Sequence, residues 1–147
     1  MIKSLPYRLG VGLVIINSQS KIFTGRRLDS TKAWQMPQGG IDDNEIPLEA
    51  AYREMGEETG IEKCKVALLK QSKLWYRYDL PKEMQGKFWG GKFRGQSQKW
   101  FLFKFIGVDS DINIHTKEPE FSDWRWSKKG DLLDGIVPFK KSLYQAV

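Results

Sequence analysis

Three glutamates stand close together in the sequence, at Glu54, Glu57 and Glu58. On a helix their i, i+3 and i+4 spacing places them on neighbouring turns, where like charges repel one another. A hard divalent cation such as Mg²⁺ or Mn²⁺ takes oxygen ligands and offsets that repulsion. Acidic triplets also occur on solvated helix faces. The triplet alone therefore leaves two interpretations open, a metal cradle and a solvated face.

An arginine, Arg53, directly precedes the triplet and has Glu49 and Glu57 four residues to either side. Its planar guanidinium is suited to holding a carboxylate through two parallel hydrogen bonds. We therefore interpret Arg53 as a residue that positions a neighbouring carboxylate.

Charge is distributed unevenly along the chain. The net charge is +6, yet residues 41–62 contain eight acidic residues and one basic residue, for a local charge of −7. The remaining 125 residues therefore carry +13. Either a solvated acidic helix or a metal site that acts on an anion held by basic surroundings accounts for this separation.

Composition excludes several other classes of protein. With 147 residues, 40% hydrophobic and 29% charged, the chain fits one globular domain. One cysteine, Cys64, and one histidine, His115, provide neither an internal disulfide nor a zinc site of sulfur and nitrogen ligands. We expect His115 on the surface. The longest apolar stretch, residues 9–16, is too short to cross a bilayer, and no signal peptide is visible. These features predict a cytoplasmic protein that does not enter a membrane.

A helix over residues 47–59 must carry the triplet. Pro47 suits its first turn, Glu49 complements its dipole and Gly60 suits its C-terminal cap. On a helical wheel, one side of this helix is apolar and is predicted to face the sheet. It is formed by Leu48, Ala51, Tyr52 and Met55.

Strands are predicted on both sides of this helix. A hairpin is expected from residues 9–16 and 22–26, and further strands at 65–69, 74–78, 99–106 and 124–126. Residues 34–40 are predicted to form a loop because they contain a proline and paired glycines. Residues 81–95 are predicted as a long loop and 138–146 as a final helix. This order favours an α+β domain with a central mixed sheet.

The helix and the loop before it together match a longer pattern. Gly39, Glu45, the run from Arg53 to Met55, Glu57, Glu58, Gly60 and Ile61 occupy all fixed positions of G-x5-E-x7-R-E-U-x-E-E-x-G-U, where U is aliphatic. Nine specified positions in 23 residues make chance agreement very improbable. Residues 39–61 thus resemble the Nudix box, and in this arrangement Glu45 can meet Arg53. The resemblance implies a single Nudix hydrolase domain over 1–147, an α/β/α sandwich, and Mg²⁺- or Mn²⁺-dependent hydrolysis of a nucleoside diphosphate linked to another group.

Similarity to this family extends over nearly the whole chain and is strongest to the branch that contains bacterial RNA pyrophosphohydrolases and dinucleoside polyphosphate hydrolases. It implies metal ligands at Glu54, Glu57, Glu58 and Glu120. Catalytic roles are implied for Arg53 and for Glu57 as the general base, with Glu54 as the alternative base.

Substrate-binding positions are also implied by the resemblance. They are Arg8, Arg27, Gly39, Phe139 and Lys140. Arg8 would contact phosphates, Arg27 and Phe139 would hold an unpaired base between them, and Lys140 would contact the nucleic-acid backbone. Phe139 also lies at helical spacing with Leu143 and Ala146, so it could instead belong to a core stripe.

The expected activity is removal of pyrophosphate from the 5′-triphosphate end of RNA, which would expose the RNA to decay nucleases. An alternative substrate is a dinucleoside polyphosphate such as diadenosine tetraphosphate. A non-catalytic nucleotide or RNA sensor is a third possibility, although a pure binding role gives no reason to keep the repulsive glutamates. No obligate protein partner is expected.

Overall fold

Two long parallel strands form the centre of the fold in a computed structural model, which describes residues 5–29, 33–81 and 88–132. Strand β1 (Tyr7–Ile16) pairs with β7 (Gly95–Phe105) in a register that runs from Tyr7 opposite Gly95 to Ile16 opposite Lys104. Residues 100–103 of β7 are apolar on both sides, which suits a strand covered on both faces. The predicted final helix at 138–146, with Phe139 and Lys140, lies outside the described residues.

The other strands extend this centre into a mixed sheet that contains eight strands in the described part of the chain. They are β2 (Ile22–Arg27), β3 (Trp34–Gln35), β4 (Gln38–Gly40), β5 (Val66–Gln71), β6 (Tyr76–Asp79) and β8 (Phe121–Ser127). The main path is β3-β2-β1-β7-β5, with β4 on β1, β6 on β7 and β8 on β2. The predicted hairpin and four later strands are confirmed, with shifted ends.

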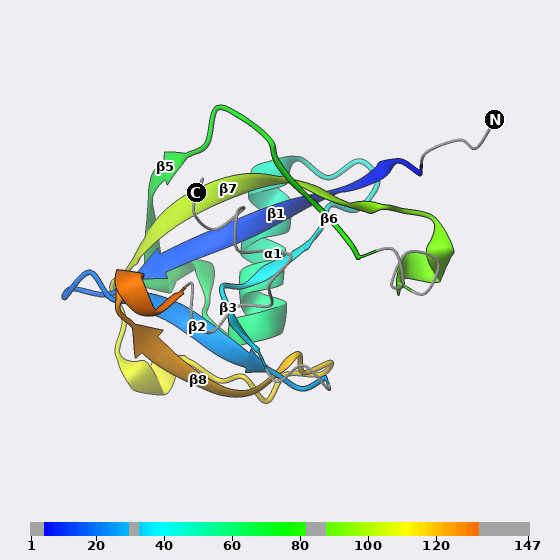
Figure 1. The fold of residues 1–147 in the computed structure, drawn as a ribbon. Helices are drawn as coiled ribbons and strands as arrows, with labels where there is room; N and C mark the ends of the chain where they lie inside the picture. Colours follow the sequence, from blue (N-terminus) through cyan, green and yellow to red (C-terminus); the bar gives the residue numbers. More distant parts are fainter. Residues whose placement is uncertain (1–4, 30–32, 82–87, 133–147) are drawn as a thin grey trace.

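Helix α1 (Pro47–Thr59) lies across one face of the sheet, behind β1 and β7 in Figure 1. Its predicted limits are confirmed, and Gly60 ends it with φ of 70°, a left-handed conformation that glycine adopts without strain. The predicted sheet-facing side is confirmed, because Ala51 and Met55 are buried and Leu48 and Tyr52 are half-buried and pack against the same core. The helix also buries residues outside that side, which are Ala50, Glu54, Glu58 and Thr59.

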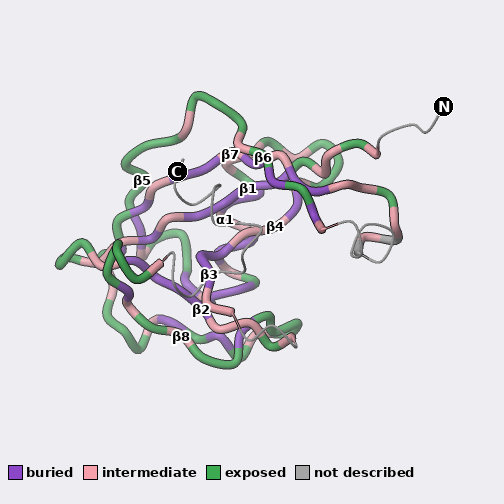
Figure 2. The backbone as a smooth tube through the Cα atoms, viewed as in Figure 1, coloured by how far each residue is buried: buried purple, intermediate pink, exposed green. Residues whose placement is uncertain are grey.

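Each face of the sheet packs its own apolar cluster. The buried residues of β1 and β7, between these clusters, are purple in Figure 2. On the helix side, Val11, Leu13 and Ile15 of β1 pack with the helix and with phenylalanines of β7. On the other side, the ring of Trp100 lies flat over Gly12, where a Cβ atom would overlap it. Successive residues of β1 point to opposite faces of the sheet, so this strand contributes to the packing on both faces.

The interpretation of residues 34–40 as a loop without strands was wrong. Two short strands, β3 and β4, flank Pro37. Gly39 and Gly40 pair with Val11 and Gly10 of β1, and the Pro37 carbonyl accepts a hydrogen bond from the Leu13 amide at 2.9 Å. The proline thus contributes an acceptor at a position that needs no donor.

Shorter 3₁₀ turns connect the remaining elements. They are η1 (Lys63–Lys65), η2 (Phe88–Gly91), η3 (Asp109–Asp111) and η4 (Lys129–Asp131). The turn η2 falls within the long loop predicted at 81–95, of which residues 82–87 lie outside the described ranges. His115 is exposed, as predicted. Across the described ranges, no helix has both the length and the apolar character needed to span a bilayer.

Candidate active site

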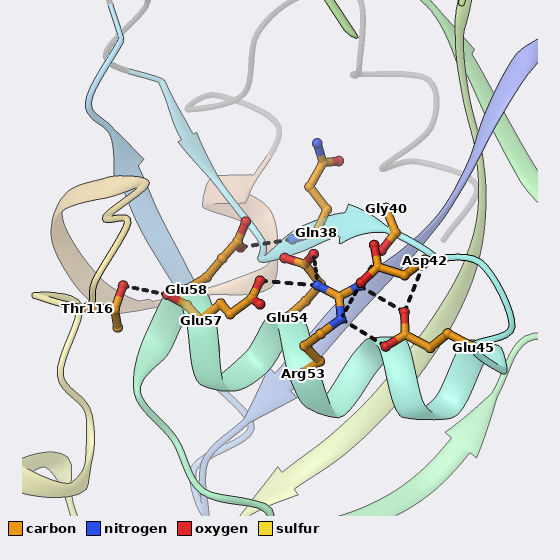
Figure 3. A network of polar contacts seen from close by, with 9 residues as sticks. All are labelled: Gln38, Gly40, Asp42, Glu45, Arg53, Glu54, Glu57, Glu58 and Thr116. Atoms are coloured by element: carbon orange, nitrogen blue, oxygen red, sulfur yellow. Dashed lines mark hydrogen bonds and ion pairs between the residues drawn. The ribbon is translucent and has the colours of Figure 1, made fainter.

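Arg53 is the centre of a carboxylate cluster on α1 (Figure 3). Its Nε and Nη2 atoms donate to the two carboxylate oxygens of Glu45 at 2.8 and 2.9 Å, and Nη2 also donates to the Gly40 carbonyl at 2.7 Å. Nη1 donates to Glu54 at 2.8 Å and to Glu57 at 3.1 Å. The expected meeting of Arg53 with Glu45 and Glu57 is confirmed.

Glu45 fixes the loop that leads into α1. Its Oε1 accepts a hydrogen bond from the Asp42 amide at 2.9 Å while both oxygens hold Arg53. These hydrogen bonds, led by the one from Arg53, lower the pKa of Glu45 below its ordinary value. Glu49, the other predicted partner of Arg53, forms no ion pair with it in the described structure. The guanidinium therefore joins the loop to the helix rather than two turns of the helix.

Glu54 is buried against β4. Its carboxyl group occupies the space where a side chain at position 39 would begin, so a Cβ atom on Gly39 would overlap it. Only 9% of Glu54 is exposed, and this burial raises its pKa to about 7 although Arg53 acts in the opposite direction. The glycine at position 39 is thus explained by the room that Glu54 needs.

The other two glutamates differ in their surroundings. Glu58 is buried, and its Oε2 accepts a hydrogen bond from the Gln38 amide at 3.1 Å. The Glu57 side chain is largely exposed, and its backbone carbonyl accepts a hydrogen bond from the Thr116 hydroxyl at 2.5 Å (Figure 3). Gln38 was not foreseen as a contributor, because a backbone donor leaves no trace in residue type.

The donor set suits a hard divalent cation. Glu54 and Glu58 present carboxylates at the edge of β4, and Glu57 lies beside them at the solvent. A buried carboxylate with a raised pKa is also a group whose charged form an added cation would stabilise. Among the described residues, no group of three or more acidic, histidine or cysteine side chains is arranged to hold a metal ion as it stands. The residues fit a cation that completes the cluster when it binds.

Glu120 comes from a separate segment. It is exposed, it immediately precedes β8, and its carbonyl accepts a hydrogen bond from the Leu28 amide at 3.0 Å. Its predicted role as a fourth ligand stays a prediction.

The two predicted substrate arginines adjoin a buried polar cluster on the face of the sheet opposite α1. Arg8 lies against Gly40 and has its Cζ atom 5.2 Å from the Trp89 ring centroid. Arg27 donates to Gln35 at 3.3 Å and forms an ion pair with Asp29. Both positive charges oppose the rise in the Tyr78 pKa that burial causes.

Within that cluster, Gln98 donates to the Gln38 side chain at 2.9 Å, and Gln96 donates to the Tyr78 hydroxyl at 2.9 Å. Neither Gln96 nor Gln98 was predicted to contribute to the site. The available signal was their alternation, because Gln96 and Gln98 lie two residues apart just before the apolar run at 100–103.

Comparison with known proteins agrees with this geometry. The family model described as "NUDIX domain" matches residues 6–147. The chain is 53% identical to an RNA pyrophosphohydrolase of Rhodospirillum rubrum, over 97% of this chain and 86% of the relative. It is 54% identical to an RNA pyrophosphohydrolase of Rickettsia typhi, over 97% of this chain and 88% of the relative.

Solved structures are similar in fold at lower identity. The dihydroneopterin triphosphate pyrophosphohydrolase of Escherichia coli superimposes with a TM-score of 0.75 at 16% identity, over 96% of both chains. An Ap4A hydrolase of Caenorhabditis elegans superimposes with a TM-score of 0.67 at 20% identity, over 93% of both chains. These two similarities concern the fold.

Proposed function

The chain belongs to the NUDIX domain family, and from this premise we propose that it hydrolyses the 5′-triphosphate end of RNA to release pyrophosphate and leave a 5′-monophosphate. The observation that carries this proposal is the similarity to RNA pyrophosphohydrolases, 53% identity over 97% of the chain. The carboxylate cluster around Arg53 is consistent with a pyrophosphohydrolase, because phosphoryl chemistry depends on positioning and on charge stabilisation.

In this proposal the metal ligands are Glu54, Glu57, Glu58 and Glu120. Mg²⁺ or Mn²⁺ held there would neutralise charge on the phosphate oxygens and make the attacking water more acidic. Arg53 keeps Glu54 and Glu57 oriented through its Nη1 hydrogen bonds of 2.8 and 3.1 Å. Gln38 orients Glu58 in the same way from β4.

Proton transfer is assigned to Glu57. Its side chain is 58% exposed and reaches the solvent in which the attacking water lies, whereas Glu54 is buried beneath Gly39. Glu54 remains the alternative base, since its pKa of about 7 suits proton exchange near neutral pH.

Substrate binding is assigned to the cations outside the cluster. Arg8, beside Gly40, would contact the phosphates, and Arg27 would stack on a base of the second nucleotide. Gly39 would let the phosphate chain approach the backbone. Phe139 and Lys140, which complete the base clamp and the backbone contact in this proposal, belong to the part of the chain that the structure does not describe. We place the reaction in the cytoplasm, with 5′-triphosphorylated RNA as the partner.

Parallel turnover of two substrates tests the proposal. The pure protein with Mg²⁺ is given single-stranded RNA carrying a 5′-triphosphate and, separately, diadenosine tetraphosphate, and pyrophosphate and nucleotide products are quantified. We expect faster hydrolysis of the RNA, and a preference for at least two unpaired nucleotides over a blunt duplex, because a paired base cannot be clamped without unpairing. Equal rates on duplex and single strands with faster cleavage of diadenosine tetraphosphate would assign the protein to the dinucleotide substrates. Absence of turnover of both would indicate a binding protein.

A further inference from the structure

The segment of residues 112–120 follows η3, passes beside the C-terminal end of α1 and leads into β8. Ile112 and Ile114 are buried, with 8% and 5% exposure, in the cluster that packs α1 on the sheet. At its other end, the Glu120 carbonyl is held by the Leu28 amide at 3.0 Å. The segment is thus fixed at both ends although it contains no helix or strand over these residues.

Between these ends, the segment binds the last turn of α1 directly. The Asn113 amide donates to the Thr59 carbonyl at 2.8 Å, and the Asn113 carbonyl lies so close to Gly60 that a Cβ atom there would overlap it. Thr116 donates its hydroxyl hydrogen to the Glu57 carbonyl at 2.5 Å (Figure 3). The final carbonyls of a helix have no partner within the helix, and α1 has no basic residue in its last turn. The segment therefore supplies hydrogen-bond donors for carbonyl groups at the end of α1 that have no partner within the helix.

The hydrogen bond from Thr116 also affects the position of Glu120. It is made to the backbone of Glu57, between Glu54 and Glu58 on the helix, and Glu120 follows Thr116 by four residues. Four extended residues reach at most about 14 Å, so this contact limits how far Glu120 can move from the helix. Ligands that are already near one another cost less entropy to order when a cation binds.

We propose that Thr116 is a positioning residue for the metal site, which ties the segment carrying Glu120 to the turn of α1 carrying Glu57. The proposal rests on the metal ligands assigned under the proposed function, but it concerns cation binding and not the identity of the substrate. Thr116 touches neither cation nor substrate. It acts by limiting the distance between the carboxylates of Glu57 and Glu120, which come from distant parts of the sequence.

Binding of Mn²⁺ to the protein without RNA, measured by electron paramagnetic resonance of the free ion, tests this role. Thr116→Val removes the hydroxyl and keeps the branched shape, and Thr116→Ser keeps the hydroxyl. We expect about 10-fold weaker Mn²⁺ binding in T116V, the scale seen when a residue that orients a ligand is lost, and near-normal binding in T116S. Ser122→Ala is the matched control, because it removes a hydroxyl that reaches the Arg26 carbonyl at 3.4 Å on the other side of Glu120. Its Mn²⁺ affinity should stay unchanged.

Double variants locate the effect. If Thr116 acts through Glu120, the loss in T116V/E120Q is smaller than the product of the two single losses. The loss in T116V/E58Q equals the product, because Gln38 holds Glu58 independently. Unchanged Mn²⁺ affinity in T116V or in E120Q would overturn the proposal, and so would equal losses in T116V and T116S or multiplying losses in T116V/E120Q. Thr116→Ala repeats the comparison should T116V fold poorly.

The outcome is separable from that of the proposed function. Weakened Mn²⁺ binding in T116V by a protein that leaves 5′-triphosphorylated RNA intact would uphold the role of Thr116 and reject the substrate. Rapid hydrolysis of that RNA with unchanged Mn²⁺ affinity in T116V would do the reverse.

Discussion

Arg53 holds Glu45 with one edge of its guanidinium, Nε to one carboxylate oxygen at 2.8 Å and Nη2 to the other at 2.9 Å. Glu45 lies in the loop before α1 and Arg53 lies within α1, next to Glu54 in the sequence. The pair therefore connects the incoming loop to the part of the helix that carries the glutamates. Such a two-point contact fixes orientation as well as distance.

Loss of this pair should lower both stability and activity. Glu45→Gln removes the charge and one strong acceptor, and we expect a loss of about 1–3 kcal/mol in the free energy of unfolding, since both side chains are mostly buried. The turnover number should also fall, because Arg53 would no longer orient Glu54 and Glu57. Urea unfolding and steady-state kinetics check this. Glu49→Gln is the control, as Glu49 lies on the same helix without pairing to Arg53; equal stability of the two variants would contradict the prediction.

The metal-free protein should lose stability as pH rises from about 5 to 7. Burial raises the pKa of Glu54 to about 7, above its ordinary value of 4.5, so the folded state retains a proton that the unfolded chain has released. Stability is therefore greatest below the unfolded value and falls by up to about 3 kcal/mol as pH rises through the folded value. Urea unfolding in EDTA at several pH values measures the slope.

Glu54→Gln should flatten that slope, and Mg²⁺ should restore stability to the wild-type protein near neutral pH. A metal-free wild-type protein whose stability increases between pH 5 and pH 7 would show that Glu54 is not responsible.

Gly39 should tolerate no side chain, unlike Gly56 on the helix. Gly39→Ala drives a methyl group into the Glu54 carboxyl, and we expect a loss of about 1–3 kcal/mol in stability together with reduced activity. Gly56→Ala meets nothing within 4 Å and should increase stability by about 0.5–1 kcal/mol, because alanine favours the helix. Thermal unfolding of both variants gives the comparison, and a Tm of G39A at or above that of the wild type would count against the packing described for Glu54.

Activity should disappear in EDTA and return with Mg²⁺ or Mn²⁺, and Glu57→Gln should reduce kcat by about 10²–10⁴-fold. Its Tm in EDTA should not fall, because relief of the repulsion from Glu54 and Glu58 offsets the loss of an exposed ion pair with Arg53. The pH–rate profile of this variant tells its two roles apart. Loss of the alkaline-going limb at saturating Mn²⁺ indicates a general base, whereas full rescue by excess Mn²⁺ indicates a ligand and places the base elsewhere.

Arg27 should affect RNA and nucleoside triphosphates differently. Arg27→Ala should reduce kcat/KM for 5′-triphosphorylated RNA by the equivalent of about 1–3 kcal/mol, the scale of one stacked base, and leave a nucleoside triphosphate nearly unaffected. Arg26→Ala is the control, because Arg26 is the neighbour of Arg27 on β2. Its strand partners are Trp34 on β3 and Asp123 on β8. Equal losses on both substrates would place Arg27 at the phosphates instead.

The sequence allowed prediction of the elements whose local signals agree. The limits of α1 were predicted from Pro47 and Gly60, and the Glu45–Arg53 contact from the box spacing. The strands β3 and β4 were missed because glycine and proline disfavour strands locally, whereas pairing of Gly39 and Gly40 with β1 is a tertiary effect.

The buried side of α1 was predicted incompletely for a related reason. Hydrophobicity placed Glu54 beside the packed face, but its carboxyl is buried where β4 has no side chain. Burial of a charged group depends on a partner distant in sequence, and no periodicity in one helix reports that partner. The contacts of Gln38 and Thr116 with the glutamates involve backbone atoms and were invisible for the same reason.

The parallel pairing of β1 with β7 has a consequence for how the protein is made. Ile16 lies opposite Lys104, so the central ladder joins positions separated by about three fifths of the chain. Contacts of such long sequence separation form slowly, since a large loop must close before they contribute. A nascent chain that ends after the Nudix box contains every glutamate of α1 yet lacks the strand beside which β1 must settle. Cation binding by that box should therefore emerge only late in synthesis, and a peptide of the box alone should bind Mg²⁺ no better than an ordinary acidic peptide.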